Sequence, residues 1–321
     1  MSVPPGGSTP ADNPPPPARG DWPEDRQAGA VTDVPLLSRA AHDRGHLARS
    51  LPDPAEGRAV RVLHVDERRT VPVHEGSAGP ELVYEERAGW PEGAIYLGAA
   101  DGVAYGAMVT PRSLTVAGRP VDSWAGLREV GGALGDLDAG LLVQAVGIIE
   151  WHERNRFSPI TGAATTIERA GWVQRDPDSG REVFPRTDPA VIMLVHDGGD
   201  RCVLGRQAVW PAGRFSILAG FVEPGESAEA AVAREVAEEV GLAVTDVRYV
   251  SSQPWPFPQS LMLGFVARAT GEELRIDHDE IEEARWFSRE ELRSGTGPQA
   301  LPPTVSIARH IIDRWVAGEF S

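Results

Sequence analysis

The sequence contains no lysine, one cysteine and two asparagines among its 321 residues. All 31 basic residues are therefore arginines, and 47 acidic residues bring the formal net charge to −16. This acidic balance argues against bulk electrostatic binding of nucleic acid or anionic membranes. The single cysteine, Cys202, excludes an intramolecular disulfide and a multi-cysteine zinc site, and we expect it to lie in a core strand.

Long apolar runs are missing as well. No stretch approaches the roughly 20 residues that span a bilayer, and the N-terminus lacks the apolar segment of a secretory signal. We therefore expect a cytoplasmic protein that makes no membrane contact. The chain length suggests two domains of about 100–200 residues each.

The first part of the chain divides into a tail and a domain. Residues 1–32 are rich in proline and glycine and cannot bury a core, so we expect a disordered tail. Runs of β-forming residues and an Asp-Gly turn, followed by apolar residues three and four apart, predict an N-terminal α+β domain over 33–154. Its predicted strands are 60–65, 81–84, 94–97 and 103–109, and its helix is 137–154.

A turn-rich connector at 155–187 leads to a second domain at 188–321. Strands outnumber helices in that domain and no βαβ alternation recurs, so a mixed α/β sandwich is favoured over a doubly wound sheet. The predicted strands are 190–196, 201–206, 247–250, 261–267 and 284–287, and the predicted helices are 228–240 and 305–316.

The helix predicted at 228–240 carries an unusual set of acidic residues. Glu235, Glu238 and Glu239 fall within one arc of this helix, where like charges destabilise it by about 0.2–0.5 kcal/mol per pair. A divalent cation such as Mg²⁺ would reverse that effect, because it prefers carboxylate oxygens. A solvated acidic face is the alternative, but it does not account for the preceding loop or for Arg234.

This segment resembles the Nudix box at all nine specified positions. The matching residues are Gly220, Glu226, Arg234, Glu235, Val236, Glu238, Glu239, Gly241 and Leu242. The resemblance implies an α/β/α sandwich that hydrolyses nucleoside diphosphates linked to another moiety, with Mg²⁺ or Mn²⁺ held by the three glutamates of the helix. It also implies structural roles for Gly220 and Gly241, and an ion pair between Glu226 and Arg234 that braces the loop.

A second motif, Ser252-Gln-Pro-Trp-Pro-Phe-Pro-Gln-Ser260, combines prolines with aromatic residues. Three alternate prolines exclude a helix and the pairing of an internal strand, so they predict a rigid extended loop. The loop is either a nucleotide platform or a polyproline segment that packs on the core. It resembles the SQPWPFPxS signature of the NADH pyrophosphatase branch of Nudix enzymes, which implies substrate contacts from Gln253, Pro254, Trp255, Pro256, Phe257, Pro258, Gln259 and Ser260.

The same resemblance implies further site residues. Glu280 matches a metal-binding carboxylate outside the box, and Ala219 matches a residue whose backbone carbonyl binds metal. Phe184 and Phe221 match aromatic positions that sandwich a base, and Ala308 matches a substrate contact. Phe184 stands where tyrosine is usual, so stacking is retained without the hydroxyl group.

One departure from the branch concerns its zinc ribbon. The positions of the four zinc-binding cysteines are occupied by Ser158, Thr161, Asp176 and Ser179. Three hydroxyls and one carboxylate lack the thiolates that hold structural zinc, so we predict no zinc. We expect the connector to be held by packing, for example through Trp172 and Phe184.

Through this resemblance, the residues imply metal-dependent hydrolysis of NADH or NAD⁺ to the nicotinamide mononucleotide and AMP. The resemblance also implies a homodimer whose active site is shared between chains. Another dinucleotide, such as ADP-ribose or FAD, and the NAD cap of an RNA 5′ end are alternative substrates. An inactive nucleotide-binding regulator is the alternative outside the enzymes.

Overall fold

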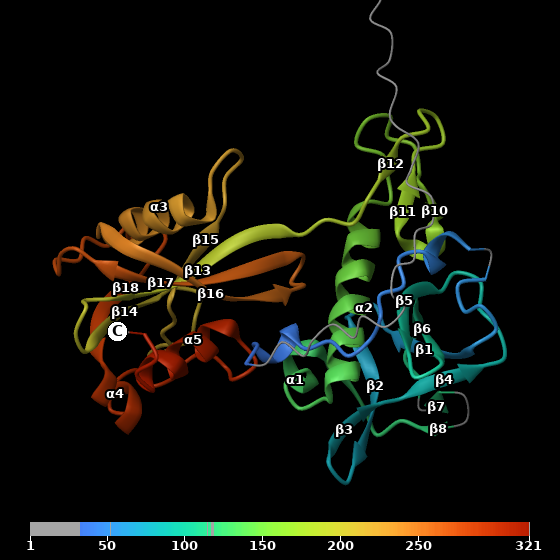
Figure 1. Ribbon diagram of the computed structural model, residues 1–321, viewed down its shortest axis with the longest axis horizontal. Coiled ribbons are helices and arrows are strands. Elements are labelled where there is room, and N and C mark those ends of the chain that lie inside the picture. The colour runs from blue at the N-terminus through green and yellow to red at the C-terminus, as the bar shows by residue number, and fades with distance from the viewer. Residues whose placement is uncertain (1–32, 52, 114, 117–118, 321) are drawn as a thin grey trace, which may run out of the picture. The chain divides into compact units, whose positions relative to one another are not determined.

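The computed structural model describes residues 33–51, 53–113, 115–116 and 119–320 (Figure 1). The tail expected at 1–32 lies outside these residues, and the domain boundaries at 154 and 187 remain predictions. No helix in the described part of the chain combines the length and apolar character that crossing a bilayer requires.

The N-terminal region contains two sheets packed with one long helix. The first sheet has the order β4-β1-β6-β5, the second has the order β3-β2-β9, and α2 is largely buried against them. The predicted Asp101-Gly102 turn joins β5 to β6, with φ values of 49° and 75°. The elements are η1 (Leu36–Ser38), η2 (Ala48–Ser50), β1 (Ala59–Val65), β2 (Thr70–Gly76), β3 (Gly79–Leu82), β4 (Tyr84–Arg87), β5 (Ile95–Ala100), β6 (Val103–Val109), β7 (Thr115–Val116), β8 (Arg119–Pro120), β9 (Ser123–Gly126), α1 (Leu127–Val130) and α2 (Asp136–Arg154).

The connector is more ordered than its turn-rich sequence suggests. It forms a three-stranded sheet of order β10-β11-β12. Trp172 anchors it, since the indole N–H donates to the carbonyl of Tyr96 at 2.7 Å and the ring packs under the guanidinium of Arg49. The elements are β10 (Thr166–Glu168), η3 (Arg169–Gly171), β11 (Val173–Arg175) and β12 (Glu182–Val183).

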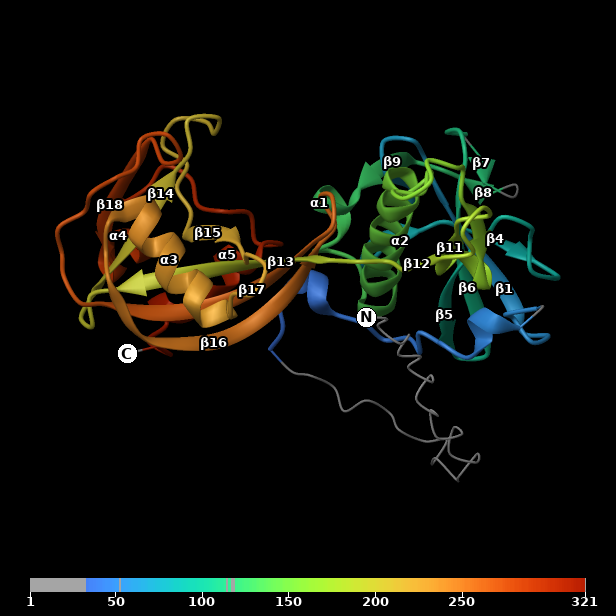
Figure 2. The same cartoon turned by 90° about the horizontal axis from the view of Figure 1, so that it is seen from above.

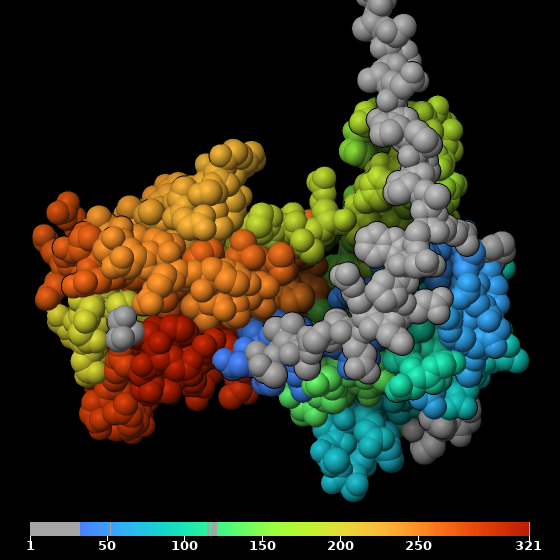
Figure 3. Space-filling view, viewed as in Figure 1, coloured from blue at the N-terminus to red at the C-terminus, as the bar shows by residue number. Residues whose placement is uncertain are grey.

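The C-terminal region is a sheet covered by helices on both faces, as the sequence predicts. The strand order is β16-β17-β13-β14-β18, and β15 pairs with β13. Figures 1 and 2 show α3 on one face and α5 on the other, and in Figure 3 the red atoms of the C-terminal residues lie below the orange ones. The elements are β13 (Asp188–His196), β14 (Arg201–Arg206), β15 (Leu218–Phe221), α3 (Ala228–Val240), β16 (Val244–Trp255), β17 (Ser260–Ala269), β18 (Glu283–Ser288), α4 (Arg289–Ser294) and α5 (Ile307–Val316).

Each face of this sheet has its own core. Val232 and Val236 of α3 pack with Val191 and Met193 on one face. Cys202 is fully buried in β14 and belongs to the opposite core, which includes Trp315 of α5. Cys202 therefore lies in a core strand, as predicted, and its burial raises the pKa of the thiol.

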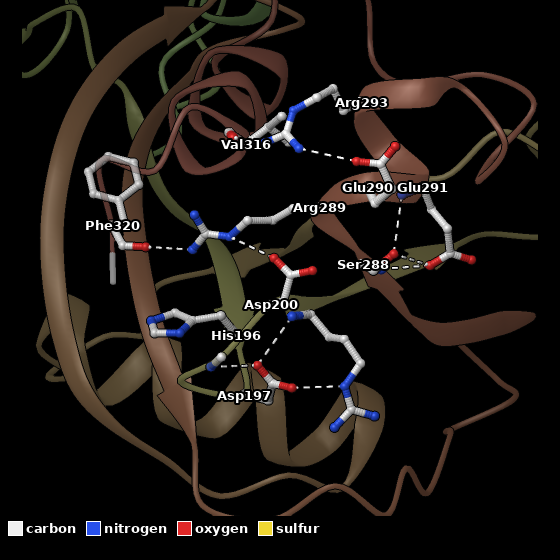
Figure 4. Close-up of polar contacts among 12 residues, drawn as sticks. His196, Asp197, Asp200, Ser288, Arg289, Glu290, Glu291, Arg293, Val316 and Phe320 are labelled. Atoms are coloured by element: carbon white, nitrogen blue, oxygen red, sulfur yellow. Dashed lines mark hydrogen bonds and ion pairs between the residues drawn. The ribbon is translucent and has the colours of Figure 1, made fainter.

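Polar contacts close the end of the sandwich at the β13–β14 turn (Figure 4). The guanidinium of Arg201 donates to Asp197 at 2.8 Å, and the backbone N–H of Arg289 donates to the carbonyl of Asp200 at 2.9 Å. Ser288 caps α4 by accepting a hydrogen bond from the backbone N–H of Glu291. Arg201 thus forms an ion pair with Asp197, and Arg289 forms one of 3.6 Å with Asp200.

The first half of the proline-aromatic motif is a strand, whereas the sequence predicts a loop. Strand β16 continues to Trp255, and Pro254 lies opposite Leu261 of β17. The prediction was wrong because β16 is an edge strand, where the side without a partner tolerates the missing N–H of a proline. A tight turn at 256–259 then joins β16 to β17, so the motif is the tip of a hairpin.

Candidate active site

The loop before α3 positions the acidic residues of the helix. Ser227 caps α3 by accepting a hydrogen bond from the backbone N–H of Ala230 at 3.2 Å, and Gly241 ends the helix with a φ of 71°. A Cβ on Gly220 would lie 1.9 Å from the carboxyl carbon of Glu235. The glycine at position 220 therefore allows the helix carboxylate to approach the backbone of β15.

Arg234 ties the loop to the helix. Its guanidinium forms two hydrogen bonds of 2.9 Å with the carboxylate of Glu226, which is the predicted ion pair, and a third of 2.9 Å with the carbonyl of Phe221. Its remaining nitrogen donates to Glu235 at 2.8 Å and to Glu238 at 2.9 Å. The hydrogen bonds from Arg234 hold the pKa of Glu226 below its usual value.

Three carboxylates converge beside this brace. Oxygen atoms of Glu235, Glu239 and Glu280 lie within 4.8 Å of one another. Glu235 and Glu239 are buried in α3, whereas Glu280 is exposed on the loop before β18. That loop is attached to the end of α3, because the backbone N–H of Asp277 donates to the carbonyl of Glu239 at 3.1 Å.

The electrostatics of this cluster are unfavourable without a cation. Burial is the main cause that raises the pKa of Glu239 to about 8, and the negative charges of Glu235 and Glu280 raise it further. A hydrogen bond from the backbone of Ala219 acts in the opposite direction. Burial also raises the pKa of Glu235. Among the described residues, Oε2 of Glu239 has no hydrogen-bond partner. Three neighbouring carboxylates, one of them with a buried oxygen that lacks a hydrogen-bond partner among the described residues, are suitable ligands for a hard divalent cation such as Mg²⁺ or Mn²⁺.

Two predicted metal ligands have different surroundings. Glu238 is outside the three-carboxylate cluster, and its exposed side chain pairs with Arg234. Ala219 lies beside the cluster, where its backbone donates to Glu239. The structure thus brings Glu235, Glu239, Glu280 and Ala219 together and leaves Glu238 at the edge.

A cavity of about 530 Å³ opens next to the cluster. Its lining includes Glu239 and Ala219, together with the predicted substrate residues Trp255 and Ala308. Two predicted substrate residues, Phe184 and Phe221, do not line it, and each is more than half exposed. The exposure of Phe184 also contradicts the expected packing role for its side chain in the connector.

The hairpin tip places its residues in three different environments. Trp255 and Phe257 form an edge-to-face pair with ring centroids 5.0 Å apart, and both pack against the N-terminal core. Gln253 is fully buried, and neither polar atom of its amide group has a partner within the described residues. Gln259 donates to Asp188 at 2.8 Å. Pro254, Pro256, Gln259 and Ser260 line a separate cavity of about 300 Å³, and Pro258 lines another.

Two arginines in the 530 Å³ cavity were missed by the sequence analysis. Arg128 of α1 places its guanidinium 4.0 Å from the ring centroid of Phe257, and Arg214 lies 5.6 Å from that of Trp210. Neither arginine forms an ion pair with a described carboxylate. A single arginine outside any motif gives no sequence signal that distant segments meet at the cavity.

The four positions aligned with zinc ligands form a hydrogen-bonded cluster. Oδ2 of Asp176 accepts hydrogen bonds from the hydroxyls of Ser158, Thr161 and Ser179 at 2.7, 2.9 and 2.7 Å. Its Oδ1 accepts from the backbone N–H groups of Asp178 and Ser179. The hydroxyl of Ser158 and the other donors keep the pKa of Asp176 well below its usual value. Two turns are therefore joined through one buried carboxylate.

Known proteins resemble this chain in sequence. A family model described as the NUDIX domain matches residues 186–314. NAD-capped RNA hydrolase NudC of Mycobacterium bovis (strain BCG / Pasteur 1173P2) is 44% identical over 303 residues, covering 90% of this chain and 97% of that protein. Human NAD-capped RNA hydrolase NUDT12 is 44% identical over 197 residues, covering 57% of this chain and 43% of that protein.

Solved structures include a NUDIX hydrolase from Nitrosomonas europaea, with a TM-score of 0.39, 19% identity, and coverage of 44% of this chain and 83% of that chain. The identity to NudC extends through both the N-terminal and the C-terminal regions. This chain belongs to the Nudix hydrolase family, in the branch that includes NudC.

Proposed function

We propose that this protein hydrolyses the diphosphate of NADH or NAD⁺, giving the nicotinamide mononucleotide and AMP, and that it also removes NAD caps from RNA. The observation that carries the proposal is the cluster of Glu235, Glu239 and Glu280 beside a cavity lined by Trp255 and Ala308. The similarity to proteins named NAD-capped RNA hydrolase supports the substrate class.

Glu235, Glu239 and Glu280 would hold Mg²⁺ or Mn²⁺, and Glu238 would join them by releasing Arg234. When bound, such an ion neutralises phosphate charge and lowers the pKa of a coordinated water. The chain need not supply a side-chain nucleophile, because phosphoryl-type transfer depends chiefly on positioning and on charge stabilisation.

The protein side chains would position the dinucleotide. Arg128 and Arg214 offer guanidinium groups without carboxylate partners among the described residues, and these can bind phosphate oxygens. Trp255 and Ala308 supply the apolar wall against which a base or ribose packs.

We further propose that the protein acts in the cytoplasm as a homodimer. Phe184 and Phe221 are exposed and lie outside the cavity lining, so two chains can bring aromatic residues together around one base. Sedimentation equilibrium tests the assembly, and a monomeric active enzyme would contradict a shared site.

The reaction is tested by incubating the purified protein with NADH and Mg²⁺ or Mn²⁺, alongside ADP-ribose and FAD, and separating the products by chromatography. We expect reduced nicotinamide mononucleotide and AMP to form faster than the products of the other substrates. Cleavage of ADP-ribose without cleavage of NADH would contradict the substrate assignment. Tight nucleotide binding without turnover would indicate a regulator.

A further inference from the structure

An arginine-lined groove lies beside the proline-aromatic hairpin. Its volume is about 570 Å³, and its cations come from three separate segments. Arg68 and Arg69 lie in the turn between β1 and β2, Arg128 lies on α1, and Arg154 is the last residue of α2. The hairpin contributes Phe257 and its flanking prolines.

The charges of this groove are not balanced. Its carboxylates are Glu129 and Glu150. Glu150 forms ion pairs of 2.7 Å with Arg69 and 3.7 Å with Arg154, while Glu129 accepts a hydrogen bond from the backbone N–H of Gly126.

Arg68 and Arg128 have no carboxylate partner within the described ranges. Four guanidinium groups against two carboxylates leave a local excess of two positive charges in a chain whose net charge is −16. The exposed guanidinium groups of Arg68 and Arg128 can therefore bind an anion in the groove.

The groove and the cavity of the candidate active site share a lining residue. Arg128 lines both this groove and the 530 Å³ cavity that contains Glu239. The same guanidinium covers Trp255, on the cavity side, at 5.4 Å and Phe257, on the groove side, at 4.0 Å. A nucleic acid strand attached to a dinucleotide in the cavity can therefore pass Arg128 and reach the other arginines of the groove.

We propose that the groove binds the RNA that follows a 5′ NAD cap, with its phosphates paired to Arg68, Arg128 and Arg154. This inference rests on the proposed function and names a binding surface for one of its substrate classes. Single-stranded nucleic acid is held where a positive groove tracks the backbone beside aromatic side chains, and Phe257 supplies the aromatic surface here. Free NADH ends at its adenosine, so it does not need the groove.

The test compares two double variants with the same change in charge. Arg68→Ser/Arg154→Ser removes cations from the groove and leaves Arg128 in place. Arg58→Ser/Arg181→Ser is the matched control, because Arg58 pairs with Glu56 as Arg154 pairs with Glu150, and Arg181 is exposed like Arg68. Neither control residue lines the groove.

Turnover of NADH and of a 5′-NAD-capped oligonucleotide is measured as a function of salt. In the groove variant we expect kcat/KM for the capped oligonucleotide to fall about tenfold, and its salt dependence to weaken by about 0.7 in slope for each lost phosphate contact. kcat/KM for NADH should stay within about twofold of the wild-type value for both variants, since free NADH makes no phosphate contact in the groove. Binding of the capped oligonucleotide in EDTA, followed by fluorescence anisotropy, should weaken in the groove variant alone.

Equal losses in the groove and control variants would overturn the proposal, because they would assign the effect to total charge. Unchanged turnover and binding of capped RNA by the groove variant would also overturn it, as would parallel losses for NADH and capped RNA. Failure of the proposed function would look different. In that case the wild-type protein would leave NADH uncleaved, whereas the anisotropy measurement would still report on the groove.

Discussion

Two buried carboxylates in this protein have opposite surroundings. Glu239 in α3 is 3% exposed, faces Glu235 and Glu280, and leaves one oxygen without a hydrogen-bond partner among the described residues. Asp176 in the connector is fully buried and accepts five hydrogen bonds from hydroxyls and backbone N–H groups. The pKa of Glu239 is raised to about 8, whereas that of Asp176 is lowered.

This difference distinguishes a buried carboxylate that stabilises the fold from one that serves the function. A buried carboxylate whose acceptor sites are all filled stabilises the fold, because its hydrogen bonds replace those it made with water. A buried carboxylate that lacks partners costs free energy in the protein alone, and such groups cluster at functional sites. Asp176 is of the first kind and Glu239 of the second.

The largest effect is expected from Glu239→Gln. Amide and carboxyl side chains have nearly the same shape, so the fold should persist, but the amide removes the negative charge of the most buried member of the cluster. We expect NADH turnover to fall about a thousandfold, because metal-assisted charge stabilisation contributes several kcal/mol. The measurement is steady-state hydrolysis with Mg²⁺ and with Mn²⁺.

Glu229→Gln is the control for this variant, since Glu229 is an exposed residue in the first turn of the same helix. It should retain wild-type turnover. Near-wild-type turnover by Glu239→Gln would show that the cluster does not bind the catalytic ion. A lower thermal stability of Glu239→Gln in EDTA would contradict the idea that the unpartnered carboxylate is a cost.

A smaller loss of activity is expected from Gly220→Ala. The new methyl group would occupy the space of the Glu235 carboxylate, which can rotate away at little cost to the fold. We expect the Mg²⁺ concentration for half-maximal activity to rise about tenfold, equivalent to a loss of about 1.4 kcal/mol in binding. Gly271→Ala is the matched control, because a Cβ there has no atom within 4 Å.

The helix that carries Glu239 could be predicted from sequence, because its signals are local. Helix α3 spans Ala228–Val240 as predicted, with Ser227 at its N-cap and Gly241 at its end. The convergence of Glu280 on this helix could not be derived from spacing, since it depends on how the loop before β18 attaches to α3. The resemblance to the Nudix family supplied that residue.

Other features depended on tertiary structure that the sequence does not encode locally. Strand β15 has four residues and pairs with β13, and it is too short to show a periodic pattern in the sequence. Pro254 pairs because β16 lies at the sheet edge, a position that cannot be predicted from the motif. That Asp176 replaces a thiolate can be read from the sequence, but the three hydroxyls surround it only because the two turns meet.

A moderate loss of stability is expected from Asp176→Asn. All five groups around Asp176 donate hydrogen bonds, and an amide would place its own N–H₂ against some of them. We expect the melting temperature to fall by several degrees, with kcat for NADH unchanged at temperatures where the variant is folded. Asp178→Asn, at an exposed neighbouring position, should melt like the wild-type protein. A similar melting temperature for both variants would contradict the structural role of the cluster.

The finest test of the comparison is the pH dependence of stability in EDTA. Glu239 has a folded pKa of about 8, above the ordinary value of 4.5, so between these limits the folded protein binds more protons than the unfolded protein. Its contribution therefore makes the free energy of unfolding decrease as pH rises, by at most about 1.4 kcal/mol per pH unit. Glu239→Gln should remove this contribution, as measured by urea unfolding between pH 5 and 8.

Asp176 should behave in the opposite way, because its pKa is lowered on folding. Its stabilisation is fully present above its ordinary pKa of 3.8 and is lost only as pH falls below that value. Asp176→Asn should therefore lower the free energy of unfolding by a constant amount between pH 5 and 8. The histidines with lowered pKa values, His42, His152 and His196, act equally in all three proteins, so their contributions cancel in the differences from the wild-type curve. Parallel curves for Glu239→Gln and the wild-type protein would remove the distinction between the two buried carboxylates.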